Sequence, residues 1–182
     1  MLYVIAGASL SGKTSARIHI TNTRKISGID SDTLRTMMND LRPDMSVGHT
    51  QDPLTNYENM RPCIQAFIHA RSFFREDYIL EGDGINLEDI KKNITENKMK
   101  AVILGYPRDT PEHRLEILEH NAPIFHWSKI LPSKILTMKI QQCIDYSVFL
   151  EHEAKRLNLD YIDVSDTKNI DDVIEEVVSH LF

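Results

Sequence analysis

The sequence predicts an α/β fold in which helices cover both faces of a mainly parallel, five-stranded sheet. Short apolar runs bounded by turn residues alternate along the chain with helix-like stretches. Such alternation is typical of parallel strands joined by right-handed crossovers, which place ligands beyond the carboxyl ends of the strands. The 182 residues, 41% of them hydrophobic, are enough for one packed core. We therefore expect residues 1–182 to form a single domain.

The five expected strands are apolar runs that end at turn residues. They lie at residues 2–6 (LYVIA), 25–30 (KISGID), 77–82 (DYILEG), 100–106 (KAVILGY) and 160–164 (DYIDV). Helices are expected where apolar residues recur with helical spacing, most clearly over residues 12–22, 135–157 and 170–181.

Composition narrows the class of protein. A formal net charge of −6 and a pI near 5.7 argue against a protein that binds extended nucleic acid by neutralising phosphates. The first strand leaves no room for a secretory leader, and no apolar stretch approaches the roughly 20 residues that cross a bilayer. Cys63 and Cys143 lack metal-ligand spacing and are expected to be thiols. We expect a cytoplasmic protein without membrane contact, either a monomer or a homodimer.

The stretch YVIAGASLSGKT carries the strongest chemical signal. Its spacing, Gly7-x-x-x-x-Gly12-Lys13-Thr14, matches the phosphate-binding loop, and an apolar strand precedes it as that loop requires. Backbone N–H groups of such a loop and the N-terminus of the next helix form a cradle for phosphates. The nucleotide-binding residues are expected to be Gly7, Ala8, Ser9, Leu10, Ser11, Gly12, Lys13 and Thr14. Lys13 would reach the β- and γ-phosphates of ATP, and Thr14 would be a ligand of Mg²⁺.

Two irregular segments between the strands are expected to close over the nucleotide. Residues 31–76 contain several prolines and too many residues for one crossover helix, so they predict a flap of short helices that binds a phosphoryl acceptor. Residues 107–134, also rich in proline, follow the fourth strand and predict a mobile lid.

The motif IDSDTLR, at residues 29–35, places two carboxylates where the second strand ends. If the backbone stays extended, Asp30 and Asp32 point the same way, so that one accepts a proton from the acceptor hydroxyl and the other holds a Mg²⁺ water. We favour Asp32 for the proton and Asp30 for the metal, although spacing alone leaves the choice open. Arg35 would clamp an anionic group of the acceptor. The competing interpretation is that Asp32 only caps the next helix.

The third strand ends in Glu81-Gly82-Asp83-Gly84. An acid at the end of an apolar strand is typical of the Walker-B carboxylate that orders the Mg²⁺ shell, and either acid fits the pattern. We assign Glu81 to the metal and Asp83 to the acceptor. A plain turn after a buried strand is the structural alternative.

Four arginines are candidates for contacts with phosphates or with an acidic acceptor. Arg108 and Arg114 follow the fourth strand and are candidate catalytic cations of the lid. Arg61 and Arg71 flank apolar residues of the flap, and Arg61 is a candidate acceptor contact. An ordinary surface position is the alternative for Arg108 and Arg114, and the solvated flank of an amphipathic helix explains Arg61 and Arg71 equally well.

These residues resemble the P-loop small-molecule kinase family, which includes shikimate, gluconate and adenylylsulfate kinases, zeta-toxin-like kinases and 2-phosphoglycerate kinase. GASLSGKT looks like the family's nucleotide loop. IDSDTLR is similar to the acceptor region of adenylylsulfate and 2-phosphoglycerate kinases, which places Asp32 as the acid near the acceptor. YILEGDGI looks like the third strand of the 2-phosphoglycerate group, apart from the insertion of Asp83 between two glycines.

The resemblance implies a strand order of 2-3-1-4-5 and transfer of a phosphoryl group from ATP, with Mg²⁺, to a hydroxyl or phosphate of a small molecule. It also implies lid arginines after the fourth strand and an adenine site in the loop after the fifth strand, here Ser165 to Lys168. A regulatory GTPase is a weaker candidate because the guanine-recognition motif is missed by one residue at 167–171. A nucleotide-binding protein without catalysis is the remaining alternative.

Overall fold

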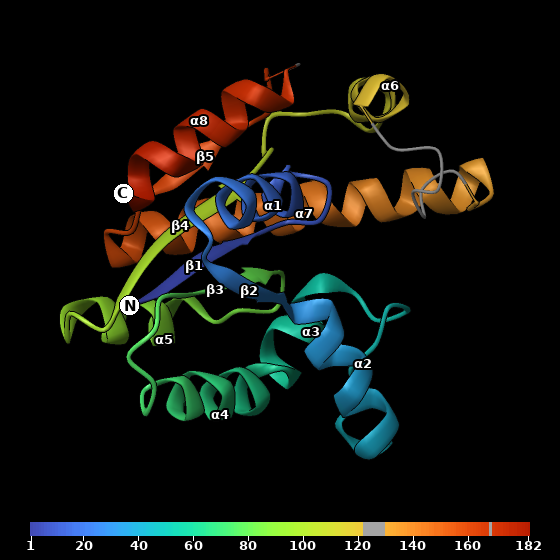
Figure 1. Ribbon diagram of the computed structural model, residues 1–182. Helices are drawn as coiled ribbons and strands as arrows, with labels where there is room; N and C mark the ends of the chain where they lie inside the picture. The colour runs from blue at the N-terminus through green and yellow to red at the C-terminus, as the bar shows by residue number, and fades with distance from the viewer. Residues whose placement is uncertain (122–129, 168) are drawn as a thin grey trace.

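A computed structural model describes residues 1–121, 130–167 and 169–182. The described residues form a five-stranded parallel sheet in the order β2-β3-β1-β4-β5, which confirms the predicted α/β fold and strand order (Figure 1). The strands are β1 (Leu2–Gly7), β2 (Ser27–Asp30), β3 (Tyr78–Gly82), β4 (Met99–Gly105) and β5 (Tyr161–Asp163). Each of them overlaps the range expected from its apolar run.

The central strand is the most completely buried. All six residues of β1 are buried, and the strand pairs with β3 on one side and with β4 on the other. A strand covered on both faces needs a continuous apolar sequence, and LYVIA provides one. Because every strand runs the same way, their carboxyl ends meet at one edge, where the glycine-rich loop begins.

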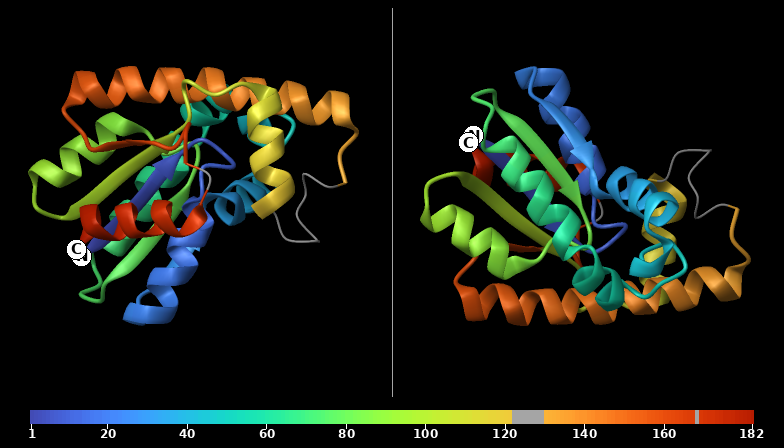
Figure 2. Two further views of the ribbon diagram at one scale, coloured as in Figure 1. Left: turned by 90° about the horizontal axis from the view of Figure 1, so that it is seen from above. Right: turned by 90° about the horizontal axis from the view of Figure 1, so that it is seen from below.

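Helices cover both faces of the sheet. The helices are α1 (Lys13–Arg24), α2 (Ser31–Leu41), α3 (Pro53–Asn59), α4 (Arg61–Arg71), α5 (Leu87–Thr95), α6 (Pro111–Asn121), α7 (Ser133–Leu157) and α8 (Ile170–Leu181). α1 packs against α8, whereas α5 packs against α7. Figure 2 shows α7 running along one side of the molecule, with α6 lying across its beginning. No helix in the described ranges is long and apolar enough to cross a membrane.

The two irregular segments contain short elements. Residues 31–76 hold α2, the 3-10 turn Pro43–Met45, α3 and α4, as the proline spacing predicts. Prolines begin α3 and α4, where their missing N–H costs no helical hydrogen bond. Residues 107–134 include α6 and the first turn of α7, while Phe125, His126 and Trp127 lie outside the described residues.

Candidate nucleotide and acceptor site

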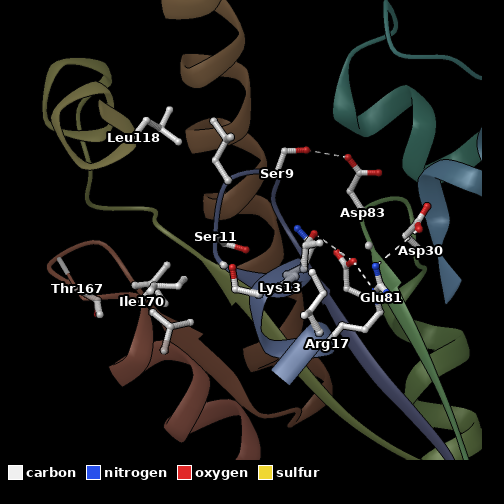
Figure 3. A pocket seen from close by; sticks show the side chains of 18 of the residues that line it. Ser9, Ser11, Lys13, Arg17, Asp30, Glu81, Asp83, Leu118, Thr167 and Ile170 are labelled. Carbon is white, nitrogen blue, oxygen red and sulfur yellow. Dashed lines mark hydrogen bonds and ion pairs between the residues drawn. The ribbon is translucent and has the colours of Figure 1, made fainter. Parts of the chain in front are cut away.

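One cavity of about 480 Å³ lies at the carboxyl edge of the sheet (Figure 3). The glycine-rich loop forms its centre, the ends of β2 and β3 form one wall, and α6 with the start of α8 forms the other. The first wall is lined by carboxylates, and the second by apolar side chains such as Leu118 and Ile170. The cavity therefore has a polar half and an apolar half on either side of the loop.

The glycine-rich loop is closed upon itself. Lys13 Nζ donates a hydrogen bond of 2.6 Å to the Ala8 carbonyl, and Ser11 Oγ donates one of 2.8 Å to the same oxygen. The buried Tyr106 hydroxyl donates a 2.7 Å bond to the Ser9 carbonyl and so anchors the loop to the end of β4. Lys13 is thus held inside the loop, at the position from which its charge can meet a phosphate.

The loop needs a glycine where α1 begins. Gly12 has a φ of 93°, in the region that side chains other than glycine rarely adopt. A Cβ atom at this position would lie 2.9 Å from Ile170 Cδ1 of α8. The second glycine of the motif therefore lets the chain turn and lets α1 approach α8.

Thr14 and Glu81 bring two side-chain oxygens together beside the loop. Thr14 Oγ1 donates to Glu81 Oε2 at 3.2 Å, and Arg17 Nε lies 3.4 Å from the same oxygen. The Glu81 side chain is only 4% exposed, and this burial raises the pKa of its carboxyl against the opposing charges of Lys13 and Arg17.

This pair fits Mg²⁺. The ion takes hard oxygen ligands, and it is usually bound by one or two carboxylates together with substrate phosphates and water. No cluster of three or more acidic, histidine or cysteine side chains suited to a metal occurs within the described ranges. The sequence did not identify Arg17, although its position one helical turn after Lys13 was a usable signal.

The prediction of an extended backbone through Asp30 and Asp32 is wrong. α2 begins at Ser31, and Asp30 is its N-cap, accepting a 2.7 Å hydrogen bond from the Thr33 N–H. Asp32 lies in the first turn of the helix, so the capping role considered for Asp32 belongs to Asp30. Both side chains still line the cavity, because the first turn of α2 faces the end of β3.

Asp32, Arg35 and Asp83 form an ion-paired cluster in the polar half. Arg35 contacts Asp32 through a very short hydrogen bond and donates a 2.8 Å bond to Asp83 Oδ1. Asp83 Oδ2 accepts a 3.1 Å bond from Ser9 Oγ, as the dashed line in Figure 3 marks. Partial loss of surrounding water raises the pKa of Asp32, although much of the side chain stays exposed, and the nearby Asp83 carboxylate raises it further. The cluster connects the nucleotide loop to the acid expected near the acceptor.

The candidate arginines have different surroundings. Arg114 is buried and lines the cavity; it forms an ion pair with Asp109, donates to the Val164 carbonyl at 3.1 Å, and lies 4.0 Å over the Tyr106 ring. Arg114 Nε has no hydrogen-bond partner among the described residues. The cavity thus includes one of the two candidate lid arginines.

Two other arginines are not among the residues that line the cavity. Arg108 is exposed and pairs with Asp163 and Glu151. Arg61 forms a bidentate pair with Asp89 of α5, with both N···O distances 3.0 Å. Spacing along the chain could not reveal either pairing, since each partner is more than 25 positions away.

The predicted adenine loop is only partly described. Ser165 is buried and donates to Asp163 Oδ1 at 2.6 Å, and it is not among the cavity-lining residues. Lys168 lies outside the described residues. Thr167 and Asn169, which the sequence did not single out, line the cavity beside Ile170.

The fold is similar to those of several solved kinases. A gluconokinase from Sinorhizobium meliloti superposes with a TM-score of 0.59 at 17% identity, over 98% of this chain and 89% of that one. A sugar kinase from a Janibacter species gives 0.59 at 14% identity, over 98% and 92%. A shikimate kinase from Acinetobacter baumannii, solved with shikimate, gives 0.54 at 12% identity, over 98% and 90%.

Sequence comparisons add no closer relative: no protein-family model matches the chain, and no curated protein sequence matches it. The structural similarity covers nearly the whole chain at low identity. The chain therefore has the fold of the P-loop small-molecule kinases, as its sequence motifs implied.

Proposed function

We propose that this protein is a small-molecule kinase that transfers the γ-phosphoryl group of ATP to a hydroxyl or phosphate of a small acceptor. The observation that carries the proposal is the arrangement of one cavity. It joins a phosphate-binding loop, a Thr14–Glu81 oxygen pair and a carboxylate cluster on the side away from the apolar half. Phosphoryl transfer requires mainly positioning and charge stabilisation, and these groups supply both.

In this mechanism the loop binds the triphosphate. Lys13 exchanges the Ala8 carbonyl for the β- and γ-phosphates, and the loop N–H groups take up the remaining charge. The apolar half, with Leu118 and Ile170, offers a surface for the adenine. Arg114 borders the same half, and its positive charge can stabilise the negative charge of the nucleotide.

Thr14 and Glu81 would hold Mg²⁺, and Asp30, which lines the same cavity and shares Arg17 with Glu81, is the candidate to order a water of its shell. When bound, the ion would act as a Lewis acid that stabilises negative charge on the phosphates. Arg17 holds the Glu81 carboxylate in place through the same oxygen that Thr14 contacts.

Asp32 accepts the proton of the acceptor hydroxyl. Its side chain is 59% exposed, so a substrate can reach it, and Arg35 fixes its orientation. A pKa above the ordinary value for Asp makes it a better proton acceptor than an unperturbed carboxylate.

The test is ADP release from ATP and Mg²⁺ across a panel of hydroxylated, carboxylated and phosphorylated small molecules, 2-phosphoglycerate and nucleotides included. We expect one acceptor class to stimulate release. Lys13→Ala should lower kcat/KM by about 10²–10³-fold and Asp32→Asn by about 10²–10⁴-fold. Tight ATP binding with no stimulation by any acceptor would instead favour a nucleotide-binding protein without catalysis.

A further inference from the structure

Carboxylates predominate in the polar half of the cavity. Asp30, Asp32 and Asp83 line it, and the described cations that contact them are Arg17 and Arg35. Arg17 lies 3.9 Å from Asp30 and 3.4 Å from Glu81, so its charge is shared between two acids. The positive charge that the polar half can offer to an incoming acceptor therefore depends mainly on Arg35.

Arg35 is already engaged. Its side chain is 7% exposed, and it binds the carboxylates of Asp32 and Asp83 through different guanidinium nitrogens. The nitrogen that contacts Asp32 also lies 3.1 Å from His49 Nδ1. These two charge-assisted contacts occupy both terminal nitrogens of the planar fork that would otherwise grip a carboxylate or phosphate. The remaining nitrogen, Nε, has no hydrogen-bond partner among the described residues, but it is buried.

Asp83 is fixed from a second direction. Its side chain is 12% exposed, and its other oxygen accepts the hydrogen bond from Ser9. Releasing Arg35 would leave this poorly solvated carboxylate with only a hydroxyl partner, which is unfavourable. An anionic acceptor would consequently meet the carboxylates of Asp32 and Asp83 without a free guanidinium. Its negative charge and those of the two carboxylates would repel one another.

We propose that Asp83 sets the charge of the acceptor, so that the polar half of the cavity takes a hydroxylated molecule that is neutral or positively charged and rejects carboxylates and phosphates. This inference rests on the proposed kinase function and narrows its acceptor to polyols and amino alcohols. Rejection arises from the repulsive element, because Asp83 engages Arg35, the arginine that contacts the acid expected near the acceptor.

The first experiment compares acceptors that differ only in charge. D-Glucitol, D-glucamine and D-gluconate share a polyol skeleton, as do glycerol, 3-amino-1,2-propanediol and glycerate, and each set offers a neutral, a cationic and an anionic member changed at one terminal carbon. With ATP and Mg²⁺, we expect kcat/KM for the anion to be lower than for its neutral partner by about ten-fold or more. A preference for the anionic members would overturn the inference and leave the kinase function intact.

The matched variants are Asp83→Asn and Asp89→Asn. Asp83→Asn releases Arg35 within the cavity, whereas Asp89→Asn releases Arg61 from a similar bidentate pair among residues that do not line it. We expect Asp83→Asn to reduce or reverse the discrimination against anions, and Asp89→Asn to keep it. Equal discrimination in the two variants would refute the role of Asp83.

A binding experiment tests the role of Asp83 even if none of these acceptors is phosphorylated. With a non-hydrolysable ATP analogue and Mg²⁺ filling the phosphate loop, inorganic sulfate is added while the melting temperature is followed. Sulfate should stabilise Asp83→Asn more than the wild type or Asp89→Asn, because only that variant has a released Arg35 in the cavity. Equal stabilisation of all three proteins would contradict the inference, whereas failure of the turnover assay alone would count against the proposed kinase.

Discussion

At the scale of single residues, the pKa of Asp32 connects the structure to a measurable pH dependence. Loss of water and the Asp83 charge raise this pKa above the ordinary 3.8. A proton acceptor must be deprotonated, so kcat/KM should rise with pH through the raised pKa. Asp83→Asn removes the repelling charge and should move this acid limb to lower pH. The measurement is kcat/KM against pH for both proteins. An acid limb at the same pH in both would mean that the limb does not report the protonation of Asp32.

Glu81 should destabilise the ligand-free protein at neutral pH. Its folded-state pKa lies above the 4.5 of the unfolded chain, so the unfolded state binds fewer protons and stability falls as pH rises through that range. Glu81→Gln should therefore raise Tm by about 2–4 °C at neutral pH and by less at pH 4.5, while abolishing Mg²⁺-dependent turnover. Thermal melts at both pH values test this, with the exposed Glu175→Gln as control. A pH-independent gain in Tm would contradict the explanation.

Residues were predictable from the sequence where a local motif fixes both backbone and chemistry. The loop from Gly7 to Thr14 and the acid Glu81 belong to this class, because strand ends and a glycine pattern determine their position. Arg61 and Arg108 belong to the opposite class. Their partners, Asp89 and Glu151, are far away in the sequence and are brought close only by the tertiary fold. Spacing along the chain therefore could not predict these ion pairs.

At the scale of elements, the turn after β3 depends on Gly82. This residue has a φ of 148°, and a Cβ atom here would lie 1.9 Å from Ser31 Oγ at the start of α2. Gly82→Ala should lower the free energy of unfolding by about 2–4 kcal/mol, because neither the backbone nor α2 can accommodate the methyl group without strain. Gly48→Ala is the matched control, since its nearest neighbour lies 3.5 Å away. Denaturant titration of both variants is decisive, and equal stability would refute the steric argument.

The hydrogen bond between the loop and the end of β3 should couple the two ligands. Ser9 connects the phosphate cradle to Asp83, and through Arg35 to Asp32. Ser9→Ala should reduce the factor by which bound ATP analogue strengthens acceptor binding, by about two- to five-fold. Calorimetric titration of the acceptor with and without nucleotide measures this factor, and Ser72→Ala, on the exposed end of α4, is the control. An unchanged factor would mean that the contact is structural only.

The elements themselves were largely predictable because apolar runs and helical stripes reflect burial. The exception is the start of α2. An alternating IDSD pattern is compatible with a strand, but Asp30 can also cap a helix. Here its side chain accepts a hydrogen bond from the Thr33 N–H, so β2 ends at Asp30 and α2 begins at Ser31. Local alternation did not reveal this because capping competes with strand extension through a side chain, not through the hydrophobic pattern.

At the scale of the whole molecule, the strand order places β3, β1 and β4 side by side, and residues of segments 31–76 and 107–134 line the same cavity. If closure of these segments excludes water, ATP hydrolysis without acceptor should be at least about ten-fold slower than transfer. Phosphate release with and without acceptor tests this. A fast acceptor-free rate would argue for an ATPase.

The overall topology was implied by a resemblance confined to three motifs, and the solved kinases share it across nearly the whole chain. The roles of flap and lid remain predictions. Segment 31–76 contributes Tyr57, Met60 and Ile64 to the core. Their burial carries no information about which other side chains of the two segments would contact a ligand.

The bond between Ser9 and Asp83 also bears on attempts to redesign the protein. Asp83 bonds to Arg35 on the proposed acceptor side and to Ser9 in the glycine-rich loop, so one side chain would border both proposed binding surfaces. A laboratory selection for a new acceptor that replaces Asp83 will therefore also alter affinity for ATP, and second-site changes that restore it should appear in the glycine-rich loop.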